Sequence, residues 1–96
     1  MAPHVSRLRR EDLYSYLLEH LSPVINTIVE EMQRNNSLNR QQIDTIGRQP
    51  DSADRTRMLV AYLETEPQPT YDGFLQAVTT LQYHDILARM NDDNTH

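Results

Sequence analysis

The chain of 96 residues contains no cysteine, which excludes disulfides, thiol catalysis and thiolate metal sites. It has only two glycines, and this scarcity disfavours a β fold with many tight turns. No run approaches the roughly 18 apolar residues of a membrane span, and residues 1–10 lack the apolar stretch of a signal peptide. We therefore expect a soluble, cytoplasmic protein with no membrane partner.

Lysine is also absent, so that all nine basic residues are arginine, against 14 acidic residues and a net charge of −5. The acidic balance argues against binding to a nucleic-acid backbone, because such proteins carry a basic excess. The arginine-only composition is explained either by lineage bias or by use of the planar guanidinium at protein interfaces. A chain of this length forms one domain with one small core.

Apolar residues recur at helical spacing in six short segments, which polar or proline-containing breaks separate. Ser22 and Pro23 are typical of an N-cap and the first residue of a second helix. Asn39 and Gln42 resemble a capping box that opens a third helix. We expect this helix to end at Gly47 in a left-handed conformation.

The breaks in the second half predict further helix boundaries. Either Asp51 or Ser52 can cap a fourth helix, and Pro67 with Pro69 must end it. Thr70 is expected to cap the fifth helix. No segment is a candidate strand, so the sequence predicts an all-α bundle. The residues expected in its core share the inward stripe of their helices: Leu17, Leu21, Ile28, Ile46, Leu59, Leu63, Phe74, Val78 and Leu87.

The fourth and fifth segments follow the pattern D-x-x-R-x-L-x-x-x-L and then F-x-x-x-L. The positions of this pattern are occupied by Asp54, Arg57, Leu59, Leu63, Phe74 and Val78. The first helix also opens with arginines at 7, 9 and 10, and the third helix is short, at 41–46. Across residues 6–91 the chain resembles the caspase recruitment domain (CARD) of the death-domain superfamily.

This resemblance implies a six-helix antiparallel Greek-key bundle, the death fold. Residues 1–5 would be an N-terminal extension, and residues 92–96 a polar tail or the start of a linker. The chain departs from the common CARD pattern at 33–37, where many members have a glycine-containing turn. Residues 83–89 do not match the R-x-D-L signature of death-effector domains. A death domain or a pyrin domain remains the alternative within the superfamily.

The resemblance implies binding to other CARDs through charged patches of opposite sign. The basic patch would lie on the first and fourth helices and comprise Arg9, Arg10, Arg55 and Arg57. The acidic patch would lie on the second and third helices and comprise Glu30, Glu31 and Asp44. Both signs on one domain permit head-to-tail self-association into helical oligomers. The competing interpretation is a solvated surface on which Arg57 pairs with Asp54.

The partners implied by the resemblance are CARD-containing caspases, adaptors or sensors, in apoptosis or in innate immunity and inflammation, where inflammasomes form. We expect no enzymatic activity, no cofactor and no metal, because the four histidines are scattered and no phosphate-binding loop or catalytic triad is evident. A helical DNA-binding domain is a less favoured alternative. Residues 40–64 could form a helix-turn-helix, but the acidic charge opposes it.

Overall fold

The computed structural model describes the backbone of residues 11–94 and the side chains of residues 13–90. Within this range the chain forms six α-helices and one 3-10 turn, and no strand occurs there. The elements are α1 (Glu11–Leu21), η2 (Ser22–Val24), α2 (Ile25–Arg34), α3 (Arg40–Gly47), α4 (Ser52–Thr65), α5 (Gln68–Thr80) and α6 (His84–Asn94). The all-α bundle expected from the sequence is confirmed.

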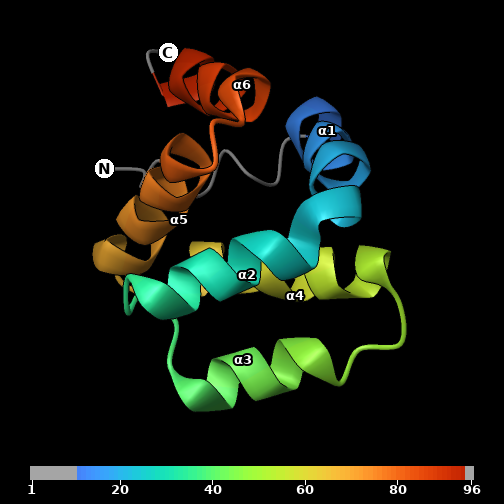
Figure 1. Ribbon diagram of the computed structural model, residues 1–96. Helices are drawn as coiled ribbons and strands as arrows, with labels where there is room; N and C mark the ends of the chain where they lie inside the picture. Colours follow the sequence, from blue (N-terminus) through green and yellow to red (C-terminus); the bar gives the residue numbers. More distant parts are fainter. Residues whose placement is uncertain (1–10, 95–96) are drawn as a thin grey trace.

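Helix α4 lies at the centre of the bundle, where it packs against α1, α2, α3 and α5. Figure 1 shows α2 in front of α4, with α3 running in the opposite direction to α2 along the lower edge. Helix α5 contacts α2 and α4, and α6 packs on α5 beside α1 at the top.

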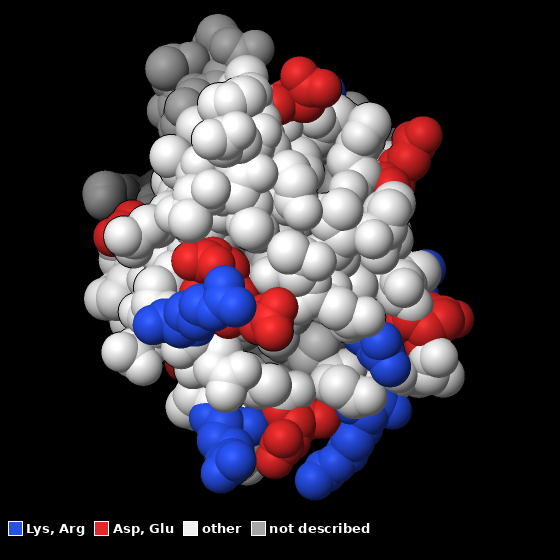
Figure 2. Space-filling view, in the orientation of Figure 1, with Lys and Arg blue, Asp and Glu red and all other residues white. Residues whose placement is uncertain are grey.

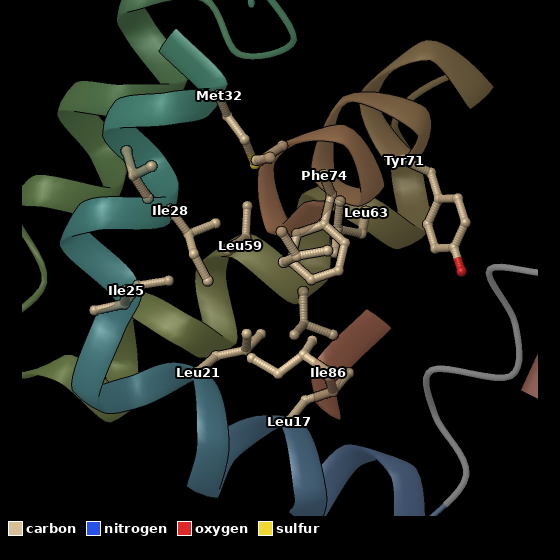
Figure 3. Packing of buried hydrophobic residues seen from close by; sticks show 14 of the residues in the cluster. Leu17, Leu21, Ile25, Ile28, Met32, Leu59, Leu63, Tyr71, Phe74 and Ile86 are labelled. Carbon is tan, nitrogen blue, oxygen red and sulfur yellow. The ribbon is translucent and has the colours of Figure 1, made fainter. Parts of the chain in front are cut away.

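The core is built around the ring of Phe74, which is fully buried (Figure 3). Side chains from α1, α2, α4 and α6 point toward this ring. All of the predicted core residues are buried except Leu87, which is only half-buried. Leu87 packs against the edge of the core and not within it, because α6 points Ile86 and Met90 most directly inward. These two residues are four apart and share one helix face, whereas Leu87 lies about 100° further round.

Two of the predicted helix starts are confirmed. The Asn39 side chain accepts a hydrogen bond from the Gln42 backbone N–H at 2.8 Å, and the Gln42 side chain accepts one from the Asn39 N–H at 2.9 Å. This is the reciprocal capping box that the sequence predicted. At the start of α4, Asp51 is the N-cap and accepts a bond from the Asp54 N–H at 2.9 Å. In both caps the side chain accepts a hydrogen bond from the backbone N–H three residues later.

Two other predicted caps are wrong. The Ser22 hydroxyl donates back to the Leu18 carbonyl of α1 and lies 3.3 Å from the buried Thr56 hydroxyl of α4. The hydroxyl is therefore engaged by α1 and α4 and does not cap α2. The N-cap position of α2 makes no side-chain hydrogen bond. Helix α5 already begins at Gln68, so Thr70 lies within its first turn and is not the N-cap. The Thr70 side chain is buried there.

The left-handed residues are also not where the sequence placed them. Helix α3 ends at Gly47, but no described glycine has a positive φ. The positive φ values belong to Asn36 and Gln82, both at 63°. At Asn36 the following N–H, of Ser37, bonds to the Met32 carbonyl at 3.0 Å, which closes α2 as a Schellman motif. Asparagine thus takes, in the 33–37 turn, the left-handed position that glycine most often occupies at a helix end.

We expect the Gln82→Gly variant to be more stable than the wild type by about 0.5–1 kcal/mol, measured by urea unfolding. Gln82 closes α5 with the same motif, since the Tyr83 N–H bonds to the Val78 carbonyl at 2.9 Å. A glutamine side chain is strained in this conformation and glycine is not. The matched variant Asn36→Gly should gain less, because asparagine tolerates a positive φ. An unchanged or lower stability of Gln82→Gly contradicts this expectation.

The turn between α2 and α3 is hydrogen-bonded to α5 at Gly73, which has no side chain. The Asn35 amide donates to the Gly73 carbonyl at 3.0 Å, and the Ser37 hydroxyl donates to the Asn35 side-chain oxygen at 2.6 Å. A Cβ atom at Gly73 would lie 2.1 Å from the Cβ of Ser37. Glycine is therefore required at this position for α5 to approach the turn, and the approach holds the α2–α3 unit in place.

Candidate protein-interaction surfaces

The predicted basic patch is only partly within the described residues, because Arg9 and Arg10 lie outside them. The remaining members, Arg55 and Arg57, are both on α4. They are two residues apart, so they project about 200° from each other around the helix axis. This separation gives the two arginines different surroundings.

Arg55 is half-buried and is engaged by neighbouring segments of the same domain. Its guanidinium donates to the Gln49 carbonyl at 3.2 Å, to the Asn26 side-chain oxygen at 3.2 Å and, more weakly, to the Gly47 carbonyl at 3.5 Å. These contacts join the α3–α4 turn, the end of α3 and the first turn of α2. The Arg55 side chain thus links α2, α3 and α4 by hydrogen bonds. A role for Arg55 in binding another protein stays a prediction.

Arg57 is exposed and pairs with its own helix. Its side chain is 52% exposed, and one guanidinium nitrogen lies 2.6 Å from an oxygen of Asp54, whose side chain is 35% exposed. Within the described part of the chain, Arg57 has no other hydrogen-bond or ion-pair partner. Most of its guanidinium edge can therefore bind a carboxylate from another molecule.

Arg89 of α6 does not extend the basic surface freely, because its guanidinium lies over the Tyr16 ring of α1, 4.9 Å from the ring centre. The Tyr16 ring also stacks on His20, with 4.1 Å between ring centres. Burial raises the pKa of the Tyr16 phenol, and the Asp85 carboxylate adds to the rise while Arg89 opposes it. The phenol is therefore neutral at physiological pH, and this cluster joins α1 to α6.

The predicted acidic residues differ in how available they are. Glu30 and Asp44 are exposed, and neither has an ion-pair partner among the described residues. Glu31 is only 15% exposed and pairs with Arg34 on the same helix at 3.1 Å. Glu30 and Asp44 are therefore the stronger candidates to meet an incoming arginine.

The surface of α2 and α3 is mixed in sign. Figure 2 shows red and blue side chains next to one another on the lower part of the face, over these helices. Residues 25–48 carry three acids and three arginines, which leaves no net charge. The arginines are Arg34, Arg40 and Arg48, and all three are exposed. The sequence itself carries this signal: the three arginines balance the three acids, so the negative charge of α2 and α3 is confined to the immediate surroundings of each carboxylate.

A groove of about 380 Å³ lies between α2 and α3, beside Glu30. Its buried members, Val29 and Ile46, form an apolar floor with the half-buried Ile43. The exposed members are polar or small: Asn26, Thr27, Glu30, Gln33 and Gly47. Such a site suits a long side chain with an apolar stem and a cationic end, as arginine has. The sequence offered no signal for it, because the groove exists only when the two helices pack.

A second hollow, of about 370 Å³, lies between the end of α1 and the α5–α6 turn. Its lining includes His20, His84 and Asp85. Within residues 11–94, no three histidine or acidic side chains come together in a way that could hold a metal ion. The same part of the chain contains no helix that is long and apolar enough to cross a membrane.

The comparison with protein families agrees with the all-α fold. A family model described as the caspase recruitment domain matches residues 8–92, nearly the whole chain. Curated proteins gave no match, and neither did solved structures.

Proposed function

The chain belongs to the caspase recruitment domain family, and on this basis we propose that it binds the CARDs of other proteins, or further copies of itself, through contacts between opposite charges. CARDs are protein-interaction modules of the death fold and are not catalysts. The proposed partners are CARD-containing caspases, adaptors or sensors. The proposed setting is the cytoplasm, where such contacts recruit or nucleate assemblies in apoptosis or innate immunity.

The observation that carries the proposal is that exposed charges of opposite sign project from different sides of one small domain. Arg55 points from α4 toward α2 and the end of α3, and Arg57 projects about 200° away from it. Glu30 and Asp44 are exposed on α2 and α3 themselves. One copy can therefore offer Arg57 to a second copy while its own carboxylates receive a third, a geometry that extends into helical oligomers.

Each such contact is weak by itself. An exposed ion pair contributes about 0.2–1 kcal/mol, and burial of an arginine stem against Val29 and Ile43 adds roughly 25 cal/mol per Å² of apolar surface. A firm assembly therefore needs several contacts at once, which effective concentration provides when domains are held together. This is the behaviour expected of a module that responds to clustering.

We expect Arg57→Glu to abolish binding, both to other copies and to a panel of CARDs, in pull-down and sedimentation measurements. The reversed charge replaces an attraction by a repulsion. The change should leave the free energy of unfolding within about 0.5 kcal/mol, because Arg57 is exposed and Asp54 is its one hydrogen-bond and ion-pair partner among the described residues. Wild-type binding should also weaken as NaCl is raised to about 0.5 M, where the Debye length is about 4 Å.

Two controls make this test specific. Arg40→Glu changes the net charge equally on exposed α3 and should not abolish binding. Glu30→Arg should by itself lose self-association, but mixing it with Arg57→Glu should restore association, since each variant keeps the surface that the other lacks. If Arg57→Glu binds like the wild type, or if its loss of binding follows unfolding, the proposal fails.

A further inference from the structure

We propose that Asp54 is a built-in competitor that holds down the affinity of the Arg57 surface. The inference rests on the proposed function, because it concerns how that surface is regulated. The 2.6 Å contact between the Asp54 carboxylate and the Arg57 guanidinium carries it. A partner that brings its own carboxylate to Arg57 must share the guanidinium with Asp54 or displace it.

Asp54 is held where it can compete at all times. It lies in the first turn of α4, one turn before Arg57, and its backbone N–H is bonded to the Asp51 cap at 2.9 Å. The positive end of the helix dipole favours a carboxylate in this turn. Its position does not depend on a flexible loop, because the N-capped helix start fixes it.

The ion pair of Asp54 and Arg57 has no net charge, so it exerts little electrostatic attraction on a distant partner. The two unit charges are in contact and cancel at distances beyond a few ångströms. Asp51 lies on the same turn and is exposed, while the charge of Arg55 is directed to the other side of α4. An approaching acidic surface therefore meets two carboxylates and one available guanidinium, and long-range attraction to this end of α4 is weak.

Competition is a better description than positioning. An exposed pair three residues apart on a helix is weak and does not lock the long arginine side chain into one geometry. Arg57 remains half-exposed in the pair, and its free N–H groups could still receive a second carboxylate. That arrangement would place two negative charges on one guanidinium, so removal of the Asp54 charge should help the partner. The consequence is a module that associates only when copies are concentrated.

The test is the self-association of the chain, measured by sedimentation at low salt. Asp54→Asn keeps the shape and an oxygen acceptor for Arg57 but removes the charge, and we expect association to tighten about three- to tenfold. The dependence on NaCl should become steeper, because the uncovered Arg57 charge is then screened by the salt. Asp51→Asn is the matched control, since asparagine also caps helices and the net charge changes equally. It should give a clearly smaller gain.

A double mutant separates this inference from the proposed function. If Arg57→Gln abolishes association and Asp54→Asn gives no gain in the Arg57→Gln background, Asp54 acts through Arg57 as proposed. If Arg57→Gln abolishes association but Asp54→Asn leaves it unchanged or weaker, competition is overturned and the proposed function stands. Equal gains from Asp54→Asn and Asp51→Asn also overturn it, in favour of a general charge effect. If Arg57→Gln associates like the wild type, the proposed function fails and competition fails with it.

Discussion

Replacing Phe74 by alanine is expected to lower the free energy of unfolding by about 3–5 kcal/mol. Phe74 is the only phenylalanine and is fully buried, and its ring meets side chains from α1, α2, α4 and α6 (Figure 3). Alanine would leave a cavity at the point where these helices meet. Because small domains have stabilities of about 5–15 kcal/mol, the variant should lose a large part of its stability.

Urea unfolding followed by far-UV circular dichroism measures this loss directly. Phe74→Leu is the matched control, since it keeps most of the apolar volume and should cost clearly less than the alanine variant. A melting temperature of Phe74→Ala close to that of the wild type would show that the ring is not the centre of the core. Strand signal in the wild-type spectrum would contradict the all-α bundle itself.

Replacing Gly73 by alanine is the second change with a large expected effect, about 1–3 kcal/mol of destabilisation or more. The added Cβ would lie 2.1 Å from the Cβ of Ser37 and 2.4 Å from its hydroxyl oxygen. The hydroxyl can rotate away, but the Cβ of Ser37 is bonded directly to the backbone, so α5 or the α2–α3 turn must move. That movement also strains the bond of 3.0 Å from Asn35 to the Gly73 carbonyl.

A second-site change tests the cause of this effect. Ser37→Gly removes both of the atoms that the new methyl group would meet, so the double variant Gly73→Ala with Ser37→Gly should be more stable than the sum of the two single losses predicts. The comparison requires unfolding curves of all four proteins in the cycle. Purely additive losses would show that the clash with Ser37 is not the reason glycine occupies position 73.

These stability effects matter for how binding data are interpreted. Phe74→Ala and Gly73→Ala should both reduce partner binding, but only because less protein is folded. Arg57→Glu and Asp54→Asn lie on the exposed side of α4 and should alter binding without a comparable loss of stability. Unfolding measured on the same preparations therefore separates the two causes.

Local signals in the sequence predicted local structure well. The capping box of Asn39 and Gln42 and the Asp51 cap were confirmed, because each needs only a partner three residues away. Ser22 and Thr70 are the same kinds of residue, but they do not cap. Ser22 is drawn to α1 and to Thr56 of α4, and Thr70 is taken into a helix that starts two residues earlier. These outcomes depend on neighbours that a local pattern does not contain.

The helical spacing of the apolar residues predicted the all-α bundle. The pattern of residues in the fourth and fifth segments carried the resemblance to the CARD family, which the family model confirms. The packing of α4 against α2 and α3, in contrast, distinguishes Arg55 from Arg57. Both are arginines on the start of α4, but Arg55 faces α2 and α3 and is used there, whereas Arg57 faces solvent. The orientation of α4 about its own axis decides which of its charged side chains bond to neighbouring helices and which stay exposed to a partner.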